Sequence, residues 1–179
     1  MKELKEFTIQ FVGLKLGEHR FDFKINKSFF EHFEYEEFND VDIKLDVILT
    51  KKNTMLEFAL AFNGFVKVNC DITNEPFNQM VKGDYHFVVN FGEVFNNENE
   101  ALIILPHGSY EINIQQYIYE SIVLALPTRR VHPGIEDGTL KSEILTKLEE
   151  LRPKLDANFD EGETTDPRWD ELKKLLTDK

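Results

Sequence analysis

The stretch "VDIKLDVILTKKNTMLEFALAFNGFVKVNC", residues 41–70, decides the predicted fold, because apolar side chains occupy every second position on both sides of a short polar break. Such alternation is typical of a β-strand with one buried face and one face toward water. The apolar positions are Val41, Ile43, Leu45, Val47 and Leu49 before the break and Leu56, Phe58, Leu60 and Phe62 after it. The stretch therefore predicts two long strands.

The polar break between these strands predicts a β-hairpin. A two-residue loop at Lys52 and Asn53 would pair residue 49 with 56, 47 with 58, 45 with 60 and 43 with 62. All four pairs are apolar, so one face of the hairpin would be buried, and burial of one face is what specifies strand register.

The dipeptide Asn63-Gly64 is ordinarily a strong signal for a second hairpin turn. A reversal there would move Val66 and Val68 to the opposite face, whereas read straight through they stay in phase with Leu60. We therefore expect one strand over residues 54–70, with no chain reversal and with a bend at Gly64.

The same alternation predicts further strands around residues 7–11, 21–25, 81–91 and 101–105. The segment 72–77 is expected to be a turn and the segment 95–100 a polar loop. Five or six strands with one wet face predict a curved antiparallel sheet in the N-terminal two-thirds, packed with C-terminal helices. The predicted fold class is α+β.

Two helices follow in the predicted first domain. Asn113 and Gln116 have the spacing of a capping box, and the apolar pattern behind them ends at Pro127. A second helix is expected from about residue 139 until Pro153.

The C-terminal composition predicts the domain organisation. "DANFDEGETT", residues 156–165, is polar and acidic, and Asp166 is a suitable N-cap for a last helix. We expect a single α+β domain over residues 1–155, an acidic linker over 156–165 and a C-terminal helix over 166–179.

Charge and hydropathy limit the classes of partner. The 179 residues include 21 Lys and Arg against 33 Asp and Glu, which gives a net charge of −12. Nucleic-acid binding depends on neutralising phosphates, whereas an acidic surface keeps a protein soluble and attracts basic partners. No secretory signal or apolar run near the roughly 20 residues of a membrane span is present. We expect a cytoplasmic protein with no membrane contact.

The residues offer little catalytic chemistry. The single cysteine, Cys70, excludes an internal disulfide or Cys-rich zinc site, and its place on an apolar strand face predicts a buried, inert thiol. The five histidines lack the spacing of metal sites, and no phosphate-binding loop or nucleophile motif occurs. We expect no enzyme activity, cofactor, metal or small-molecule substrate.

The stretch "FFEHFEYEEFNDVD", residues 29–42, interleaves five aromatic residues with six acids and contains no Lys or Arg. One interpretation is a short helix with Phe29, Phe30 and Phe33 in the core and a solvated acidic side. The other is a docking surface for a basic protein, steered by acids and held by aromatics. The residues assigned to that surface are Glu34, Glu36, Glu37 and Phe38.

A tight basic cluster, Arg129, Arg130 and His132, follows the helix that ends near Pro127. These side chains have three possible roles. They would neutralise the last carbonyls of the helix, pair with nearby acids, or bind a phosphate or carboxylate through the planar guanidinium groups.

The segment "YEINIQQYIYESIVLALPTRRVH", residues 110–132, resembles the signature of the YceD-like family, the large ribosomal RNA subunit accumulation proteins. In that signature an apolar helix end is followed by a proline, a short loop and a histidine. The matching positions here are Glu120, Ile122, Leu124, Leu126, Pro127 and His132.

A second segment, "FNGFVKVNCDITNEPF", is similar to another family motif, with Gly64, Cys70, Pro76 and Phe77 in register. The tail "DPRWDELKKLL" also looks like that of some members. Many relatives have a second cysteine where this chain has Thr73, so a metal or redox role of that pair is not expected here. Arg130 stands where relatives often have a second proline.

The resemblance implies a non-enzymatic role in the accumulation of 23S rRNA and in assembly of the large ribosomal subunit. Two mechanisms are open. The acidic surface would hold a basic large-subunit ribosomal protein, or Arg129, Arg130 and His132 would contact rRNA or a pre-ribosomal particle. From the fold alone, a carrier of a small apolar ligand under a curved sheet is a further alternative.

Overall fold

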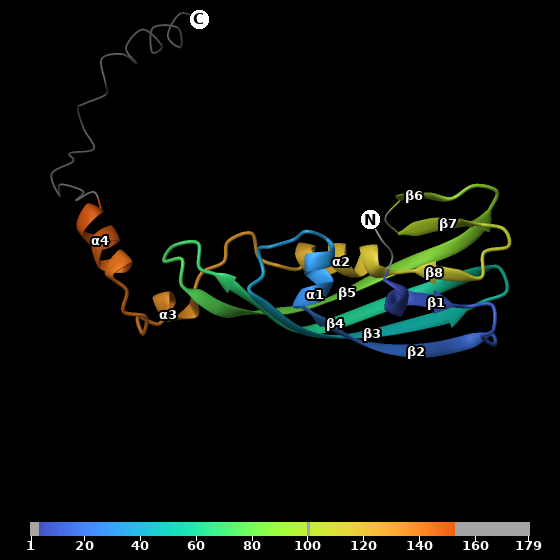
Figure 1. Ribbon diagram of the computed structural model, residues 1–179, viewed down its shortest axis with the longest axis horizontal. Coiled ribbons are helices and arrows are strands. Elements are labelled where there is room, and N and C mark those ends of the chain that lie inside the picture. Colours follow the sequence, from blue (N-terminus) through green and yellow to red (C-terminus); the bar gives the residue numbers. More distant parts are fainter. Residues whose placement is uncertain (1–3, 100, 153–179) are drawn as a thin grey trace, which may run out of the picture. The chain divides into compact units, whose positions relative to one another are not determined.

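The computed structural model describes residues 4–99 and 101–152, and the chain divides into two units, Met1–Leu140 and Lys141–Lys179. The elements are labelled in Figure 1. In chain order they are η1 (Lys5–Phe7), β1 (Thr8–Gln10), β2 (Gly17–Asn26), α1 (Lys27–His32), β3 (Asp40–Lys51), β4 (Met55–Asn69), β5 (Pro76–Gly92), β6 (Asn96–Asn99), β7 (Leu102–Pro106), β8 (Glu111–Asn113), α2 (Gln115–Leu124), α3 (Pro133–Glu136) and α4 (Glu143–Leu151).

The first unit contains an open six-stranded sheet with the order β2-β3-β4-β5-β7-β6 (Figure 1). The α+β class and the curved, mostly antiparallel sheet are confirmed. One pair differs from the expectation, since β7 runs parallel to β5. Residues 96–99, predicted as loop, form β6, which pairs antiparallel with β7. The chain thus reverses twice after β5, and the second reversal returns β7 to the direction of β5.

The strand predicted near residues 7–11 does not join the six-stranded sheet. It forms β1, which pairs with β8 in a separate two-stranded sheet, with Ile9 opposite Ile112. Both of these isoleucines are buried. Local alternation identified the strand and its buried face, but it contains no information about which distant strand is the neighbour.

The β3–β4 hairpin has a register that differs by two residues from the prediction. Leu49 lies opposite Phe58 rather than residue 56, and the loop residues are Asn53 and Thr54. The Lys52 N–H donates to the Met55 carbonyl at 3.0 Å and closes the turn. A two-residue shift keeps every side chain on its face, so the apolar pattern alone does not distinguish the two registers.

Strand β4 continues through Asn63-Gly64, which confirms the predicted absence of a chain reversal. Gly64 pairs with Ile43 on one side and Val81 on the other. A Cβ atom at this position would overlap the Asp42 carbonyl oxygen and approach the Ile43 Cα to 2.6 Å. The close approach of the β3 backbone therefore explains why glycine stands in the middle of a strand.

The turn between β4 and β5 is shorter than the predicted 72–77. Pro76 and Phe77 already belong to β5, opposite Asn69 and Val68. Proline suits this place because it is the first residue of the strand.

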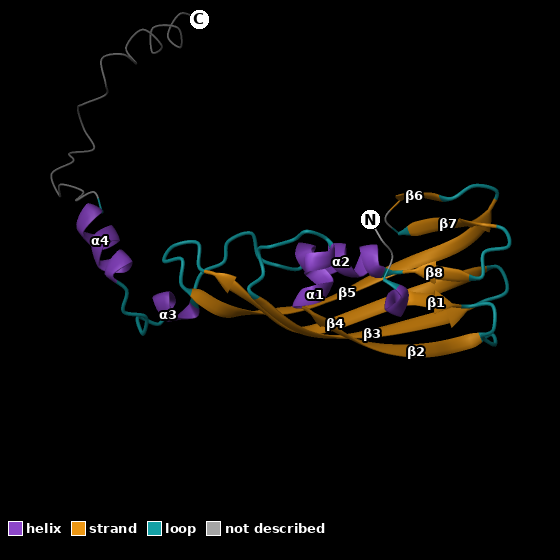
Figure 2. Cartoon of the chain, viewed as in Figure 1, coloured by secondary structure: helices purple, strands orange, loops and turns teal. Residues whose placement is uncertain are grey.

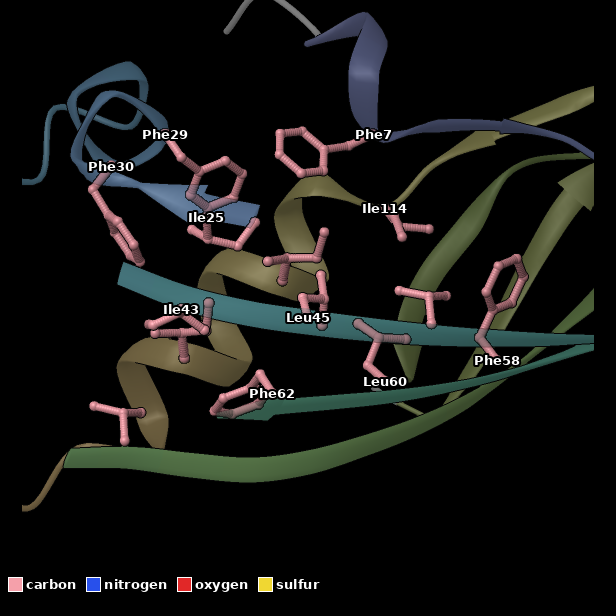
Figure 3. Packing of buried hydrophobic residues seen from close by; sticks show 14 of the residues in the cluster. Phe7, Ile25, Phe29, Phe30, Ile43, Leu45, Phe58, Leu60, Phe62 and Ile114 are labelled. Carbon is pink, nitrogen blue, oxygen red and sulfur yellow. The ribbon is translucent and has the colours of Figure 1, made fainter. Parts of the chain in front are cut away.

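The core lies on one face of the sheet, beneath α1, α2 and the β1–β8 pair. Figure 2 shows α1 and α2 over the sheet, and Figure 3 shows apolar side chains packed between these helices and the sheet. Ile114, Ile118 and Ile122, spaced one helical turn apart, are all fully buried. Their apolar stripe fixes which side of α2 faces the sheet.

Helix α2 begins at Gln115, one residue later than an N-cap at Asn113 would give, and the predicted capping box is wrong. Asn113 accepts from the Gln115 N–H at 3.0 Å and donates through its amide to the Leu4 carbonyl and the Thr8 hydroxyl. Gln116 instead donates to Glu120 at 2.6 Å. Asn113 therefore joins the helix start to the N-terminal segment.

The second predicted helix starts later than residue 139. It is α4, at Glu143–Leu151, in the second unit, and the four-residue helix α3 precedes it in the first unit. The predicted linker at 156–165 and the last helix at 166–179 lie outside the described residues and stay predictions.

Candidate functional site

The aromatic residues of the segment 29–38 are mostly core residues. Phe29 and Phe30 in α1 are buried, and Asn26 caps this helix by accepting from the Phe29 N–H at 3.3 Å. Phe38, assigned from the sequence to a docking surface, is only 1% exposed and meets Phe30 edge to face at 4.7 Å. The Phe38 side chain is therefore not accessible to a partner in this structure.

The acids of the same segment remain on the surface. Glu34, Glu36 and Glu37 are all exposed, and Glu34 has a φ of 57°, in the turn that follows α1. The Tyr35 hydroxyl donates to Glu37 Oε2 at 3.1 Å. Burial, followed by this hydrogen bond, raises the pKa of Tyr35 to about 12, so the phenol stays protonated and keeps donating at neutral pH.

Arg130 connects the basic loop to this acidic segment, 93 residues away in the chain. Its Nη1 lies 2.8 Å from Glu37 Oε2, and its Nε lies 3.8 Å from Asp71 Oδ1. The Arg130 backbone also binds Asp71: the Arg130 N–H donates to Asp71 Oδ2 at 2.6 Å, and the Arg130 carbonyl accepts from the Asp71 N–H at 2.9 Å. The acidic segment and the basic loop thus form one site.

The two arginines of the loop have different surroundings. The Arg130 side chain is only 25% exposed and lies between two carboxylates. Arg129 is exposed and forms no ion pair with any residue that the structure describes. Of the roles considered for this loop, pairing with nearby acids is the one that Arg130 fulfils.

His132 attaches the end of the loop to the sheet. Its N–H donates to Cys70 Sγ at 3.3 Å, and its Nδ1 accepts from the Gly134 N–H at 2.9 Å, which caps α3. Its ring meets Phe77 edge to face at 5.4 Å. These contacts give His132 a clear structural role.

Cys70 is 2% exposed at the end of β4. Burial alone raises the pKa of the thiol, but hydrogen bonds from the Thr73 hydroxyl and from the backbone N–H groups of His132, Thr73 and Ile72 outweigh it. The pKa of Cys70 is therefore lowered from its usual value. The Cys70 thiol is shielded from solution by its burial and not by a raised pKa.

The remaining residues of the family motif lie along α2 and its exit. Glu120 is exposed and accepts from Gln116, and Leu126 packs against the core. Leu124 is 82% exposed, and Pro127 is exposed three residues after the helix ends. This half of the motif therefore positions the loop that contains Arg130.

Two residues of the site were not singled out from the sequence. Asp71 holds the Arg130 backbone and side chain, and Tyr35 holds Glu37. An acid in a turn and a tyrosine among acids are common, so neither position has a local signal that would have identified it.

The described residues contain no group of three or more His, Cys, Asp or Glu side chains that could hold a metal ion. None of the helices within 4–99 and 101–152 has both the length and the apolar character needed to cross a membrane.

Comparison with known proteins gives one family. The family model of the large ribosomal RNA subunit accumulation protein YceD matches residues 58–176, about two thirds of the chain. No curated protein and no solved structure gives a significant match. The matched region includes Gly64, Cys70, Asp71 and the whole basic loop, whereas Glu34, Glu36 and Glu37 lie before it. The chain belongs to the family of large ribosomal RNA subunit accumulation proteins, YceD.

Proposed function

We propose that the chain supports 23S rRNA accumulation and large-subunit assembly, in the cytoplasm and without catalysis, by binding a basic large-subunit ribosomal protein. Membership of the YceD family supports the role in accumulation of the large-subunit RNA. The net charge of −12 supports a basic protein as the partner, because an acidic surface attracts basic molecules and repels phosphates.

The neutralised state of Arg130 is the observation that carries the proposed mechanism. Glu37 and Asp71 already occupy its guanidinium, and both carboxylates would lie close to any phosphate that approached it. Releasing Arg130 for RNA would leave these two acids unpaired beside the RNA backbone, which like-charge repulsion disfavours.

The acids of the segment are available for a basic partner. Glu34 and Glu36 are exposed and have no ion pair with any side chain in the described ranges. Exposed charges of this kind mainly raise the rate of encounter with an oppositely charged protein. Phe38 is not part of the proposed surface, because it is buried.

Direct contact with rRNA is the second candidate, and exposed Arg129 is the residue that favours it. A carrier of a small apolar ligand has less support. The sheet face that would have to be hollow is filled by Ile118 and Ile122 of α2 and by Ile114 just before it, all of which are buried.

The two binding modes are separated by comparing two variants of the chain. Glu34→Gln with Glu36→Gln removes two free acids and leaves the Glu37–Arg130 pair intact, while Arg129→Ala removes the free guanidinium. For a basic large-subunit ribosomal protein at low salt, we expect the first variant to associate roughly threefold or more slowly and to lose part of its salt dependence. Arg129→Ala should change this association little.

Matched controls are Glu93→Gln with Glu98→Gln, two exposed acids in and beside β6. These changes remove the same charge far from the site in the sequence, so an equal effect would indicate general electrostatics only. If a 23S rRNA fragment binds the full chain and Arg129→Ala abolishes this binding, while the glutamate variants bind the ribosomal protein normally, the proposed mechanism is wrong.

A further inference from the structure

Strand β2 forms one edge of the six-stranded sheet. Its ten residues, Gly17–Asn26, pair with β3 on one side only, and no strand among the described residues pairs with the other side. Figure 1 shows this outer side of β2 uncovered within the first unit. An edge strand of this length presents a row of backbone N–H and C=O groups that another strand can bind.

The charges on the solvent face of β2 alternate in sign at every second residue. They are Glu18, Arg20, Asp22 and Lys24, and all four are exposed. Charges on an edge strand usually prevent association. An alternating row, however, permits pairing in a register that brings opposite charges together.

Strand β3 does not satisfy this row of charges. The directly opposite pairs are Asp22 with Asp46 and Lys24 with Lys44, both of like charge. Like charges directly opposite each other destabilise a sheet. Lys24 reaches Asp42 diagonally at 3.3 Å.

We propose that β2 pairs antiparallel with β2 of a second copy of this chain, centred on Phe21, to form a symmetric dimer with one continuous sheet. In this register Glu18 lies opposite Lys24 of the second copy, and Arg20 lies opposite Asp22 of the second copy. Two-fold symmetry repeats both pairs, so four unlike pairs form across the interface.

The charges select this register over its neighbours. Moving the centre to Arg20 would place Arg20 opposite itself and Glu18 opposite Asp22. Moving the centre to Asp22 would place Asp22 opposite itself and Arg20 opposite Lys24. Parallel in-register pairing would place every charge opposite itself. Of these pairings, only the one centred on Phe21 places each of the four charged residues opposite a residue of opposite charge.

The core-facing side of β2 is also suited to self-pairing. Phe21 and Phe23 pack against the core but remain half-buried. In the proposed register Phe21 lies opposite Phe21 of the second copy, and Phe23 lies opposite His19. Cross-strand aromatic pairs stabilise sheets, and the contact would cover apolar surface that each copy leaves exposed.

A charge-swap experiment on the full chain tests the dimer and its register together. In Arg20→Glu, residue 20 would face Asp22 of an identical copy, and in Asp22→Arg, residue 22 would face Arg20. We expect the original chain to sediment as a dimer in a concentration series, and each variant alone to dimerise about tenfold more weakly or worse. An equimolar mixture of the two variants should form a heterodimer, because the introduced glutamate then faces the introduced arginine, and Asp22 of one variant faces Arg20 of the other.

Lys82→Glu and Asp84→Arg are the matched controls, since Lys82 and Asp84 lie two residues apart, exposed, on β5, which β3 and β4 separate from β2. These variants should dimerise like the original chain. An original chain that stays monomeric overturns the proposal. So do single variants that dimerise normally, or a mixture that forms no heterodimer although both variants have the far-ultraviolet spectrum of the original chain.

Discussion

The aromatic segment 29–38 and the loop 129–134 meet at the Glu37–Arg130 pair, yet different forces hold them to the sheet. In the first segment Phe30 is fully buried, with ring contacts to Phe29, Phe38 and Tyr119 at 5.3, 4.7 and 6.0 Å. In the second, the main attachments are hydrogen bonds, from the Arg130 N–H to the Asp71 carboxylate and from the His132 N–H to Cys70 Sγ.

The stability of the whole fold and the local attachment of the loop 129–134 therefore depend on different interactions. Burial of a large aromatic side chain stabilises the whole fold, because the cavity left by its removal is surrounded by the core. Hydrogen bonds at a partly exposed site stabilise less, because water replaces them when the segment moves away. We therefore expect the loop to open without unfolding of the sheet, and the aromatic segment to unfold only with it.

The largest expected effect comes from Phe30→Ala. Removal of a fully buried phenyl ring should lower the free energy of unfolding by about 3–5 kcal/mol, measured by denaturant unfolding. Phe95→Ala is the control, since Phe95 is 50% exposed and its truncation should cost far less. Equal losses in both variants would mean that the segment 29–38 does not belong to the cooperative core.

Asp71→Ala should have a smaller global effect and a clear local one. Asp71 provides a carboxylate acceptor for the Arg130 N–H and an ion-pair partner for its side chain, so we expect a loss of about 1–3 kcal/mol. Because the same loop covers Cys70 through His132, the thiol should react faster with a thiol reagent.

The control for this change is Asp84→Ala, which removes an exposed acid on β5 and should leave the thiol reaction unchanged. If Asp71→Ala lowers stability while Cys70 reacts at the original rate, the loop and the sheet open together, and the two segments do not differ as described.

Tyr35→Phe should give the smallest effect, visible at alkaline pH. The pKa of Tyr35 is raised to about 12, so the folded state favours the protonated phenol. The stabilisation is complete below the usual pKa of about 10 and is lost as the pH rises through about 12. Without this phenol, the denaturation midpoint should fall less between about pH 10 and about pH 12.

Tyr117, whose pKa burial also raises to about 12, remains in this variant and retains part of the alkaline loss. Tyr110→Phe, at an exposed position, is the control and should behave like the original chain. An unchanged alkaline loss in Tyr35→Phe would show that ionisation of Tyr35 does not couple to folding.

Local patterns predicted the elements and their faces well. Alternation identified Leu45, Leu49 and Leu60 as core residues, and all three are buried, because side-chain direction in a strand depends only on position parity. The same logic predicted the uninterrupted strand through Gly64. It did not identify the register of the hairpin, since a displacement by two residues preserves every face.

The candidate site was predictable only in parts. The sequence indicated the acids at Glu34, Glu36 and Glu37 and the cations at Arg129 and Arg130 as two separate clusters. It also left open whether the neighbouring aromatics, including Phe38, face a partner or the core. The structure places Phe38 in the core and joins the two clusters through Arg130.

By itself, the sequence determined the α+β class, the strands with their buried faces, the acidic character of the chain and its membership of the YceD family. These properties depend on residue type and on spacing within a few positions. Only the tertiary structure decided that β7 runs parallel to β5, that β2 is an edge, and that Glu37 and Asp71 neutralise Arg130. The physical reason is that these contacts join residues far apart in the chain, and their choice depends on how all the apolar faces pack together.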